Sequence, residues 1–417
     1  MGLFPRYRLI LPEDKQPSTS ANIPLFQQIQ RIYLPLSYGE ETPICRFAEG
    51  DRVVQGDRLT TPETADLLPT YSPVEGVLES FRRLSHPLYG ELACAVIRPA
   101  IMPTPPPESE QVITPTPAQV IAAAKAAAII DEIDGLPLYR KLEEWQKNGC
   151  DYLVANGVEA EPYAATAFSL LRAHPNSVSN GLWLAAETVH AAGSHIAVQA
   201  NRHQRSVLPK SVKNRLFFVP DGYPVTTYCH AGKDVAVGMI GVQACLALHR
   251  AVTLREPHYY LYVTVAGDAV KQPQTLCVPF GTPAGELLRY CGLTCNPEQI
   301  IFGDAITGVA VPSASLPILP GVTCLLALKK AADKEHPCIG CGRCLTVCHA
   351  HLKPEEIARQ VESMHFDRLP HLHPENCDQC GACSAVCPMG RDVAAMVAEA
   401  VESDGQIWMN WGNSNGI

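Results

Sequence analysis

Eight cysteines near the C-terminus have the residue type and the spacing that could do chemistry. They form two runs, each reading C-x2-C-x2-C-x3-C, and residues 349–376 separate the runs. Thiolates at this spacing hold 4Fe-4S clusters, which exchange single electrons. The sequence therefore predicts two 4Fe-4S clusters. The first run is Cys338, Cys341, Cys344 and Cys348, and the second is Cys377, Cys380, Cys383 and Cys387, with Pro388 directly after it.

The order of the cysteines predicts a crossed arrangement of ligands. Three cysteines at two-residue intervals can surround one cluster, and in bacterial-type ferredoxins the fourth cysteine ligates the other cluster. We expect one cluster on Cys338, Cys341, Cys344 and Cys387, and the other on Cys377, Cys380, Cys383 and Cys348. Small residues between the ligands let backbone amides turn toward the sulfides, and they are Gly340, Gly342, Gly381 and Ala382. The pattern departs from ferredoxins at one position, because His349 instead of proline follows Cys348.

Zinc and disulfides are the other uses of so many cysteines. Zinc sites usually take two C-x2-C pairs rather than two runs of four, so zinc is the weaker interpretation. The N-terminus carries Arg6 and Arg8 but no long apolar segment, so we expect no secretory signal. A disulfide framework is then disfavoured, and the scattered further cysteines indicate a reducing compartment. Since eight cysteines complete two clusters, we expect the nearby histidines to surround the clusters without ligating them: His336, His349, His351, His371 and His373.

Composition limits the class of protein further. A chain of 417 residues with 47% hydrophobic residues predicts two to four domains with ample cores. The net charge of −9 argues against nucleic acid as a main partner. Pro317 and Pro320 interrupt the longest apolar stretch, residues 311–328, so we expect no transmembrane segment. We therefore expect a cytoplasmic protein, either free or peripheral on the cytoplasmic side of the inner membrane.

Residues 1–100 predict a small all-β unit, because short β-branched runs alternate with turn signals. The segments 48–59 and 71–78 follow the pattern GD-x-V-x-x-GD-x-L and SP-x-x-G-x-V, which resembles the barrel-sandwich hybrid fold of lipoyl and biotinyl carriers. Such carriers present a modified lysine between these segments, and residues 60–70 contain none. A structural or docking role is therefore the better interpretation. Residues 101–117 are a proline-rich linker.

The rest of the chain predicts a multidomain α/β and α+β protein. Residues 118–257 predict a Rossmann-like α/β domain with a parallel sheet, because helices alternate with short apolar strands. The expected elements are an alanine-rich helix, a strand at 152–157, a long helical stretch over 165–192 and a strand at 196–198. In residues 258–330, strands at 259–265 and 275–280 and a helix at 283–290 suggest a β-grasp domain. Residues 331–400 hold the cysteine runs of a ferredoxin-type dicluster domain with a helix over 354–364, and 401–417 form a tail.

This order of domains resembles the C subunit of the Rnf electron-transport complex and its relative, the cobalamin reductase of propanediol-utilisation microcompartments. Besides the cysteine runs, the resemblance depends on the segments 156–163 (NGVEAEPY), 263–273 (VTVAGDAVKQP) and 302–308 (FGDAITG). It implies an SLBB-like β-grasp domain, and a domain similar to the flavoprotein subunit of respiratory complex I that binds FMN and NADH. It also implies that Glu159 and Glu161 face the flavin and nicotinamide, and that redox proteins of a membrane electron-transport complex or a microcompartment enzyme are the partners.

The chain departs from this family at the flavin loop. Relatives carry the loop G-L-G-G-A-G-F-P-T before a K-L pair, and its bare amides approach the phosphates. Aligned on Pro137 and on Lys141, residues 130–138 read IDEIDGLPL, and of the glycines only Gly135 remains. The new carboxylates at 131, 132 and 134 would repel a phosphate.

We therefore expect an electron-transfer protein that relays single electrons through two 4Fe-4S clusters and does not bind FMN or NADH in the family's manner. The loss of the glycines makes NADH dehydrogenase activity the less favoured interpretation. The alternative is an NADH-dependent FMN/iron-sulfur oxidoreductase, and bound FMN would distinguish the two. A third interpretation is a scaffold with structural clusters that do not undergo reversible reduction.

Overall fold

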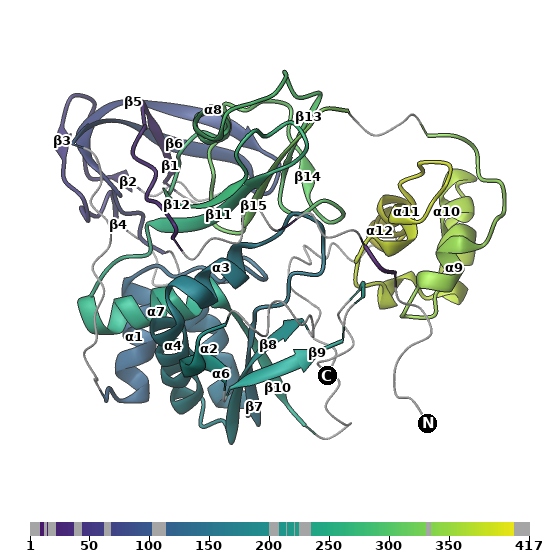
Figure 1. Ribbon diagram of the computed structural model, residues 1–417, viewed down its shortest axis with the longest axis horizontal. Helices are drawn as coiled ribbons and strands as arrows, with labels where there is room; N and C mark the ends of the chain where they lie inside the picture. The colour runs from purple at the N-terminus through teal and green to yellow at the C-terminus, as the bar shows by residue number, and fades with distance from the viewer. Residues whose placement is uncertain are drawn as a thin grey trace.

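The computed structural model of this chain is described here for residues 9–11, 15, 22–36, 44–61, 68–101, 114–199, 208–213, 215–220, 222–224, 235–330 and 335–403. Figure 1 shows three parts: a β-rich part, an α/β part beside it, and a small helical part at one end. The fold is mixed α/β with several sheets. Most of the proline-rich linker, most of the tail and residues 62–67 between the carrier-like segments lie outside the described residues.

The N-terminal part is all β in its described residues, as the sequence predicts. A four-stranded antiparallel sheet has the order β1-β6-β5-β3, and β2 pairs with β4 beside it. Its centre is the hairpin of β5 and β6, in which His86 pairs with Gly90 across the turn. The strands are β1 (Ile32–Pro35), β2 (Ile44–Cys45), β3 (Arg52–Val53), β4 (Thr60–Thr61), β5 (Glu75–His86) and β6 (Gly90–Ile101).

Residues 258–330 form a five-stranded sheet of order β12-β11-β15-β13-β14. Its central pair, β11 and β15, is parallel, and β12 pairs antiparallel with β11, as expected. Every residue of β11 is buried, which explains its continuous apolar sequence. The elements are β11 (Tyr260–Ala266), β12 (Gln274–Pro279), α8 (Ala284–Cys291), β13 (Gln299–Phe302), β14 (Val309–Ala310) and β15 (Cys324–Leu328).

One hydrophobic cluster joins these two β-rich parts, although the sequence separates them by more than a hundred residues. Ile32 and Leu78 from the first part pack in the same buried cluster as Val263, Leu276 and Phe302 from the second. All five side chains are at most 1% exposed, so the two sheets bury their apolar faces against each other.

The α/β part contains a parallel sheet of order β10-β7-β8-β9, which confirms the expected parallel layer. Helices pack against it (Figure 1). The elements are α1 (Pro117–Ala126), α2 (Leu138–Asn148), β7 (Tyr152–Asn156), α3 (Thr166–Ala173), α4 (Pro175–Thr188), β8 (Gly193–Gln199), α6 (Lys210–Lys213), β9 (Leu216–Val219), β10 (Val237–Gly241) and α7 (Val242–Leu254).

The helical stretch expected over 165–192 is present, but it ends at Thr188 and the structure divides it into α3 and α4. His174 lies between them, with φ −127° and ψ 47°, outside the helical region. Pro175 has no backbone N–H to donate and takes the first position of α4, where none is needed. The proline therefore ends one helix and begins the next.

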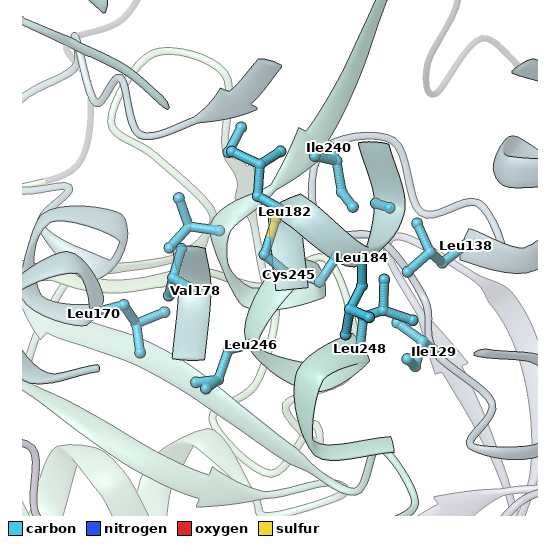
Figure 2. Packing of buried hydrophobic residues seen from close by; sticks show 14 of the residues in the cluster. Ile129, Leu138, Leu170, Val178, Leu182, Leu184, Ile240, Cys245, Leu246 and Leu248 are labelled. Atoms are coloured by element: carbon cyan, nitrogen blue, oxygen red, sulfur yellow. The ribbon is translucent and has the colours of Figure 1, made fainter. Parts of the chain in front are cut away.

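The core of the α/β part lies where α4 and α7 pack together. Figure 2 shows Leu182 and Leu184 of α4 among Cys245, Leu246 and Leu248 of α7, and all of them are buried. The two helices approach closely at Gly181, where an added Cβ would lie 1.8 Å from the carbonyl oxygen of Cys245. Only glycine permits this contact between the helix backbones.

The cysteine-rich part is helical and lies at one end of the molecule (Figure 1). Its core forms where α10 and α12 pack, with Ile357, Val361, Leu369 and Val397 buried. The helix expected over 354–364 is confirmed as α10. The elements are α9 (Arg343–Val347), α10 (Pro354–Glu362), η3 (Phe366–Leu372), η4 (Pro374–Asn376), α11 (Ala382–Ala385) and α12 (Val393–Ser403). Among the helices in the described ranges, none has both the length and the apolar composition needed to cross a bilayer.

Candidate metal centre

The two cysteine runs have the same backbone conformation at matching positions. Gly340 and Gln379, each two residues after the first cysteine of its run, have φ of 65° and 56°. This left-handed conformation points their amides at sulfur: the Gly340 N–H donates to Sγ of Cys338 at 3.4 Å, and the Gln379 N–H donates to Sγ of Cys377 at 3.3 Å. Amide donors of this kind stabilise the negative charge of cluster sulfurs.

A short helix follows each set of turns and carries the third cysteine. Gly342 and Gly381, with φ of 70° and 72°, directly precede α9 and α11. Cys344 and Cys383 are the second residues of these helices, and Cys348 ends α9. Because α9 and α11 pack against each other, the chain can bring the last cysteine of each run to the other run.

The first predicted ligand set lines one cavity. Cys338, Cys341, Cys344 and Cys387 all contribute to its wall, together with Pro388. Cys387 comes from the second run, so the fold brings it to the first three cysteines as the crossed arrangement requires. Four thiols around one cavity fit the donor set of a 4Fe-4S cluster.

The second predicted set lies together as well. Cys348 of the first run is close enough to Cys377 and Cys383 that its charge affects both thiols. Burial, the larger cause, and these neighbouring sulfurs raise the pKa of Cys377 to about 11 and that of Cys383 to about 12. The thiols must therefore lose protons when they bind metal.

The two sets differ in exposure. Cys338 and Cys341 are exposed, and Ile339 between them is 63% exposed. The cysteines of the second set are partly buried, and Cys380 packs with Tyr223 and Ile306 from other parts of the chain. The first set is therefore open to solvent at Cys338 and Cys341, whereas every cysteine of the second set is partly buried.

His349, the departure from the ferredoxin pattern, connects the two runs. Its Nε2 lies 2.9 Å from Oδ2 of Asp378, which follows the first cysteine of the second run. Burial raises the pKa of Asp378, but the hydrogen bond and the charge of His349 outweigh burial and leave the pKa below its ordinary value. The carboxylate is therefore ionised, and the pair holds the two runs together.

Glu161 ties the region around the second set to the rest of the chain. Its Oε2 accepts a hydrogen bond from the N–H of Ile306 at 2.5 Å, and its Oε1 accepts one from Oγ1 of Thr307 at 2.6 Å. The hydroxyl of Tyr223 donates to the carbonyl oxygen of Cys380 and lies 3.4 Å from Oε1 of Glu161. Glu161, expected from the resemblance to face a flavin, here has internal partners.

Glu159, the other acidic residue of that segment, also has internal partners. Its carboxylate accepts N–H donors from Ala167 at 2.7 Å and Phe168 at 3.2 Å, in the first turn of α3. The carboxylate thus satisfies amides that the start of a helix leaves free. Glu159 and Glu161 both act here as connections within the protein.

The loop that replaces the flavin loop contains a buried ion-pair cluster. The ammonium of Lys141 lies 2.7 Å from Asp131 and 2.5 Å from Asp134. Gly135, expected near the flavin, forms the turn of this loop with φ 69° and donates its N–H to the carbonyl oxygen of Asp131. The lysine charge is thus already neutralised by two carboxylates.

Glu132 of the same loop reaches the first turn of α7. Its carboxylate accepts the N–H of Gln243 at 2.6 Å and of Ala244 at 3.0 Å, and Asp131 accepts the N–H of Gly241 at 3.0 Å. Burial, then the charge of Asp131, raise the pKa of Glu132 to about 8. The amides that could bind a phosphate are taken by side chains, so the residues present do not fit FMN.

Two family models match the chain. Residues 132–215 match the model described as the Nuo51 FMN-binding domain, and residues 337–391 match the 4Fe-4S dicluster domain. The second match covers both cysteine runs and agrees with the grouping of their thiols. The chain is therefore an iron-sulfur protein with a C-terminal ferredoxin-type dicluster domain.

Curated relatives extend the similarity along most of the chain. The C subunit of the ion-translocating oxidoreductase complex of Vibrio cholerae is 25% identical over 392 residues, which cover 86% of this chain and 50% of that protein. The equivalent protein of Rhodobacter capsulatus is 28% identical over 270 residues, with 58% and 52% covered. This chain spans about half the length of these relatives.

A third relative matches over most of both chains. The C subunit of the Na(+)-translocating ferredoxin:NAD(+) oxidoreductase complex of Acetobacterium woodii is 25% identical over 395 residues, which cover 88% of each chain. Together these relatives confirm the resemblance to Rnf C subunits that the motifs indicated.

Tyr223 and Asp304 lie in segments that loosely or partly resemble the family, but sequence patterns alone did not place either residue near the cysteine runs. Asp304 is partly buried, and its Oδ1 is enclosed without a hydrogen-bond partner within the described part of the chain. Burial, then the charges of Glu161 and Glu159, raise the pKa of Asp304 to about 8. Its place in the segment 302–308, on which the family resemblance partly depends, was the one available signal.

Proposed function

We propose that this chain relays single electrons between redox partners through two 4Fe-4S clusters. One is held by Cys338, Cys341, Cys344 and Cys387, and the other by Cys377, Cys380, Cys383 and Cys348. The observation that carries the proposal is the exchange of the fourth cysteines: Cys387 lies in the cavity of the first run, and Cys348 lies beside the thiols of the second.

Each part of the site has a role in this relay. When bound, the clusters supply reversible one-electron exchange. The amides of Gly340 and Gln379 stabilise negative charge on the ligand sulfurs. The exposed Cys338 and Cys341 allow a partner to approach the first set, whereas the hydrogen bond from Tyr223 fixes the backbone of Cys380 in the second.

The remaining parts of the chain are a scaffold for this site. We assign them as a barrel-sandwich hybrid at 1–100, a Rossmann-like domain at 118–257 and an SLBB-like β-grasp domain at 258–330. The sheet orders support these assignments, and the hydrophobic cluster shared by the first and third supports their acting as one rigid body.

The partner is another redox protein of a membrane complex, with this chain peripheral on its cytoplasmic side. The relatives are named as subunits of ion-translocating oxidoreductase complexes, which favours this partner over a microcompartment enzyme. A first cysteine set that is open to solvent suits transfer to such a protein.

Iron content tests the proposal. Anaerobically purified protein should contain about eight irons per chain and show the paramagnetic signal of reduced clusters. Cys387→Ser should lose about half of the iron, because one cluster loses a ligand. Cys295→Ser is the matched control, since Cys295 is exposed and lies outside both runs. Full iron content in Cys387→Ser, or zinc in place of iron, would contradict the proposal.

The alternative function is an NADH-dependent FMN/iron-sulfur oxidoreductase. The match of residues 132–215 to the FMN-binding domain favours it. Stoichiometric FMN in the purified protein, with bleaching of the cluster absorbance by NADH, would establish it. The occupied amides at the start of α7 argue against it.

A further inference from the structure

The start of α7 is the natural place for a ligand in the α/β part. It follows β10 directly, and in open parallel sheets ligands bind outside the carboxyl ends of the strands, at helix N-termini. The main-chain amides of Gly241, Gln243 and Ala244 have no carbonyl partner within the helix, and donors in this position suit a phosphate group.

Side chains of the loop before α2 already occupy this site. Glu132 takes the amides of Gln243 and Ala244 with its two carboxylate oxygens, at 2.6 and 3.0 Å, and Asp131 takes the amide of Gly241 at 3.0 Å. These contacts join residues more than a hundred positions apart, so they are part of the tertiary fold. Glu132 is partly buried, and both of its carboxylate oxygens are directed at main-chain amides of the protein.

The side chain of Glu132 also fills the space beside the amides. A Cβ added to Gly241 would lie 2.0 Å from the carboxylate carbon of Glu132. Glycine at this position therefore leaves room for the side chain of Glu132 and for no further group. A phosphate could reach the amides only if that side chain left.

The positive charge near the site, on Lys141, is also paired. Lys141 is buried, and its ammonium contacts Asp131 at 2.7 Å and Asp134 at 2.5 Å. The charge that would attract a phosphate is thus balanced by two carboxylates. Both the hydrogen-bond donors and the positive charge of the site are used inside the protein.

We propose that Glu132 is a built-in substitute for a phosphate group and keeps flavin and nucleotide phosphates out of the α/β domain. This inference deepens the proposed function, on which it rests, because it removes flavin from the electron route. Truncation of Glu132 should open an anion site for the phosphate of FMN or for inorganic phosphate.

Binding of FMN to the full-length protein with its clusters tests the proposal. Wild-type protein should retain no FMN after gel filtration, whereas Glu132→Ala should bind FMN at least about tenfold more tightly than wild type. Riboflavin, which has no phosphate, should bind neither protein. Glu132→Gln is the matched control: it can accept a hydrogen bond from only one of the two amides, but a side chain of the same length still fills the space, so it should exclude FMN as wild type does.

A second variant also removes the charge of Asp131. Asp131→Asn combined with Glu132→Ala takes the negative charge away from the Gly241 amide and should bind FMN more tightly than Glu132→Ala alone. Inorganic phosphate should raise the melting temperature of Glu132→Ala and of the double variant, because main-chain amides at the start of α7 are then free to bind it. The melting temperature of wild type should stay unchanged.

Three results would overturn the proposal. They are FMN bound to wild type, no gain of FMN or phosphate binding in folded Glu132→Ala, and equal binding of riboflavin and FMN. If Glu132→Ala and the double variant do not fold, amide hydrogen exchange on the wild-type protein tests the proposal instead. Added FMN or phosphate should then leave the exchange rates of the Gln243 and Ala244 amides unchanged, and slower exchange would overturn the proposal. Iron content and the paramagnetic signal are measured in the same samples, so failure here is distinguishable from failure of the electron relay.

Discussion

The hydroxyl of Tyr223 donates a hydrogen bond to the main-chain carbonyl of Cys380, 157 residues further along the chain. Cys380 is a proposed ligand of the second cluster, so a tyrosine outside the cysteine-rich part fixes the backbone of a ligand. Burial of Tyr223 raises its pKa, so the phenol stays protonated and remains a donor. Around this contact Val347, Ala382 and Ile306 complete a small apolar cluster.

Removal of this hydroxyl should weaken the attachment of the cysteine-rich part. Tyr223→Phe leaves the Cys380 carbonyl without its donor, at a cost of about 1–2 kcal/mol in the free energy of unfolding. Iron content should stay that of wild type, and iron should be lost faster in air. Tyr89→Phe is the control, because Tyr89 also donates to a main-chain carbonyl, that of Pro320, far from the cysteines. Equal rates of iron loss in the two variants would contradict the role of Tyr223.

Two glycines at matching positions should differ in their tolerance of alanine. Gly342 and Gly381 have φ near 70°, so alanine costs each about 1–2 kcal/mol of backbone strain. An added Cβ at Gly381 also lies 2.7 Å from Ile306, whereas at Gly342 the nearest atom, on Leu345, is 4.0 Å away. We expect Gly381→Ala to be less stable than Gly342→Ala by about 1–3 kcal/mol in thermal unfolding. Equal stability of Gly381→Ala and Gly342→Ala would show that Ile306 makes no steric clash with a side chain at position 381.

Asp304, whose Oδ1 is enclosed in the protein, should make stability depend on pH. Its pKa is about 8 in the fold against an ordinary value of 3.8, so its contribution to stability is full below 3.8 and is lost as the pH rises through 8. Asp304→Asn, which stays neutral, should therefore show a melting temperature that falls less than that of wild type from pH 5 to pH 8. The exposed Asp268→Asn serves as the control and should keep the wild-type slope. An unchanged slope in Asp304→Asn would contradict the assignment.

The contact between α4 and α7 should not tolerate alanine at Gly181. A Cβ there would lie 1.8 Å from the carbonyl oxygen of Cys245, so the helices must separate, at a cost of about 3 kcal/mol or more. Gly285, in α8, has its nearest neighbour at 3.2 Å. Gly285→Ala should be close to neutral, since the better helix propensity of alanine offsets the tighter contact. Thermal unfolding of both variants checks the difference.

The turns around the clusters show which backbone conformations sequence patterns predict and which they do not. The sequence predicts small residues at Gly340, Gly342 and Gly381, because the turns around a cluster need left-handed backbone. It does not predict Gln379, which adopts φ 56° at the position that matches Gly340. A fold can impose this conformation on a residue other than glycine when the surrounding contacts determine it.

Sequence patterns were enough to predict the two clusters, to propose their eight ligands, and to predict that the sheet of the α/β part is parallel. Those features depend on spacing within short segments, on hydrophobic periodicity and on proline positions, which are local. The loss of the flavin-loop glycines is local too, and it already argued against FMN.

The partners of the buried polar side chains depend on contacts between distant segments, which sequence patterns do not predict. Glu132 accepts a hydrogen bond from the first turn of α7, more than a hundred residues away. Glu161 accepts one from Ile306, 145 residues further along the chain. The common core of the first and third parts is equally distant in sequence. Such pairings carry no periodic signal, because a buried carboxylate can be satisfied by any amide that the fold brings within reach.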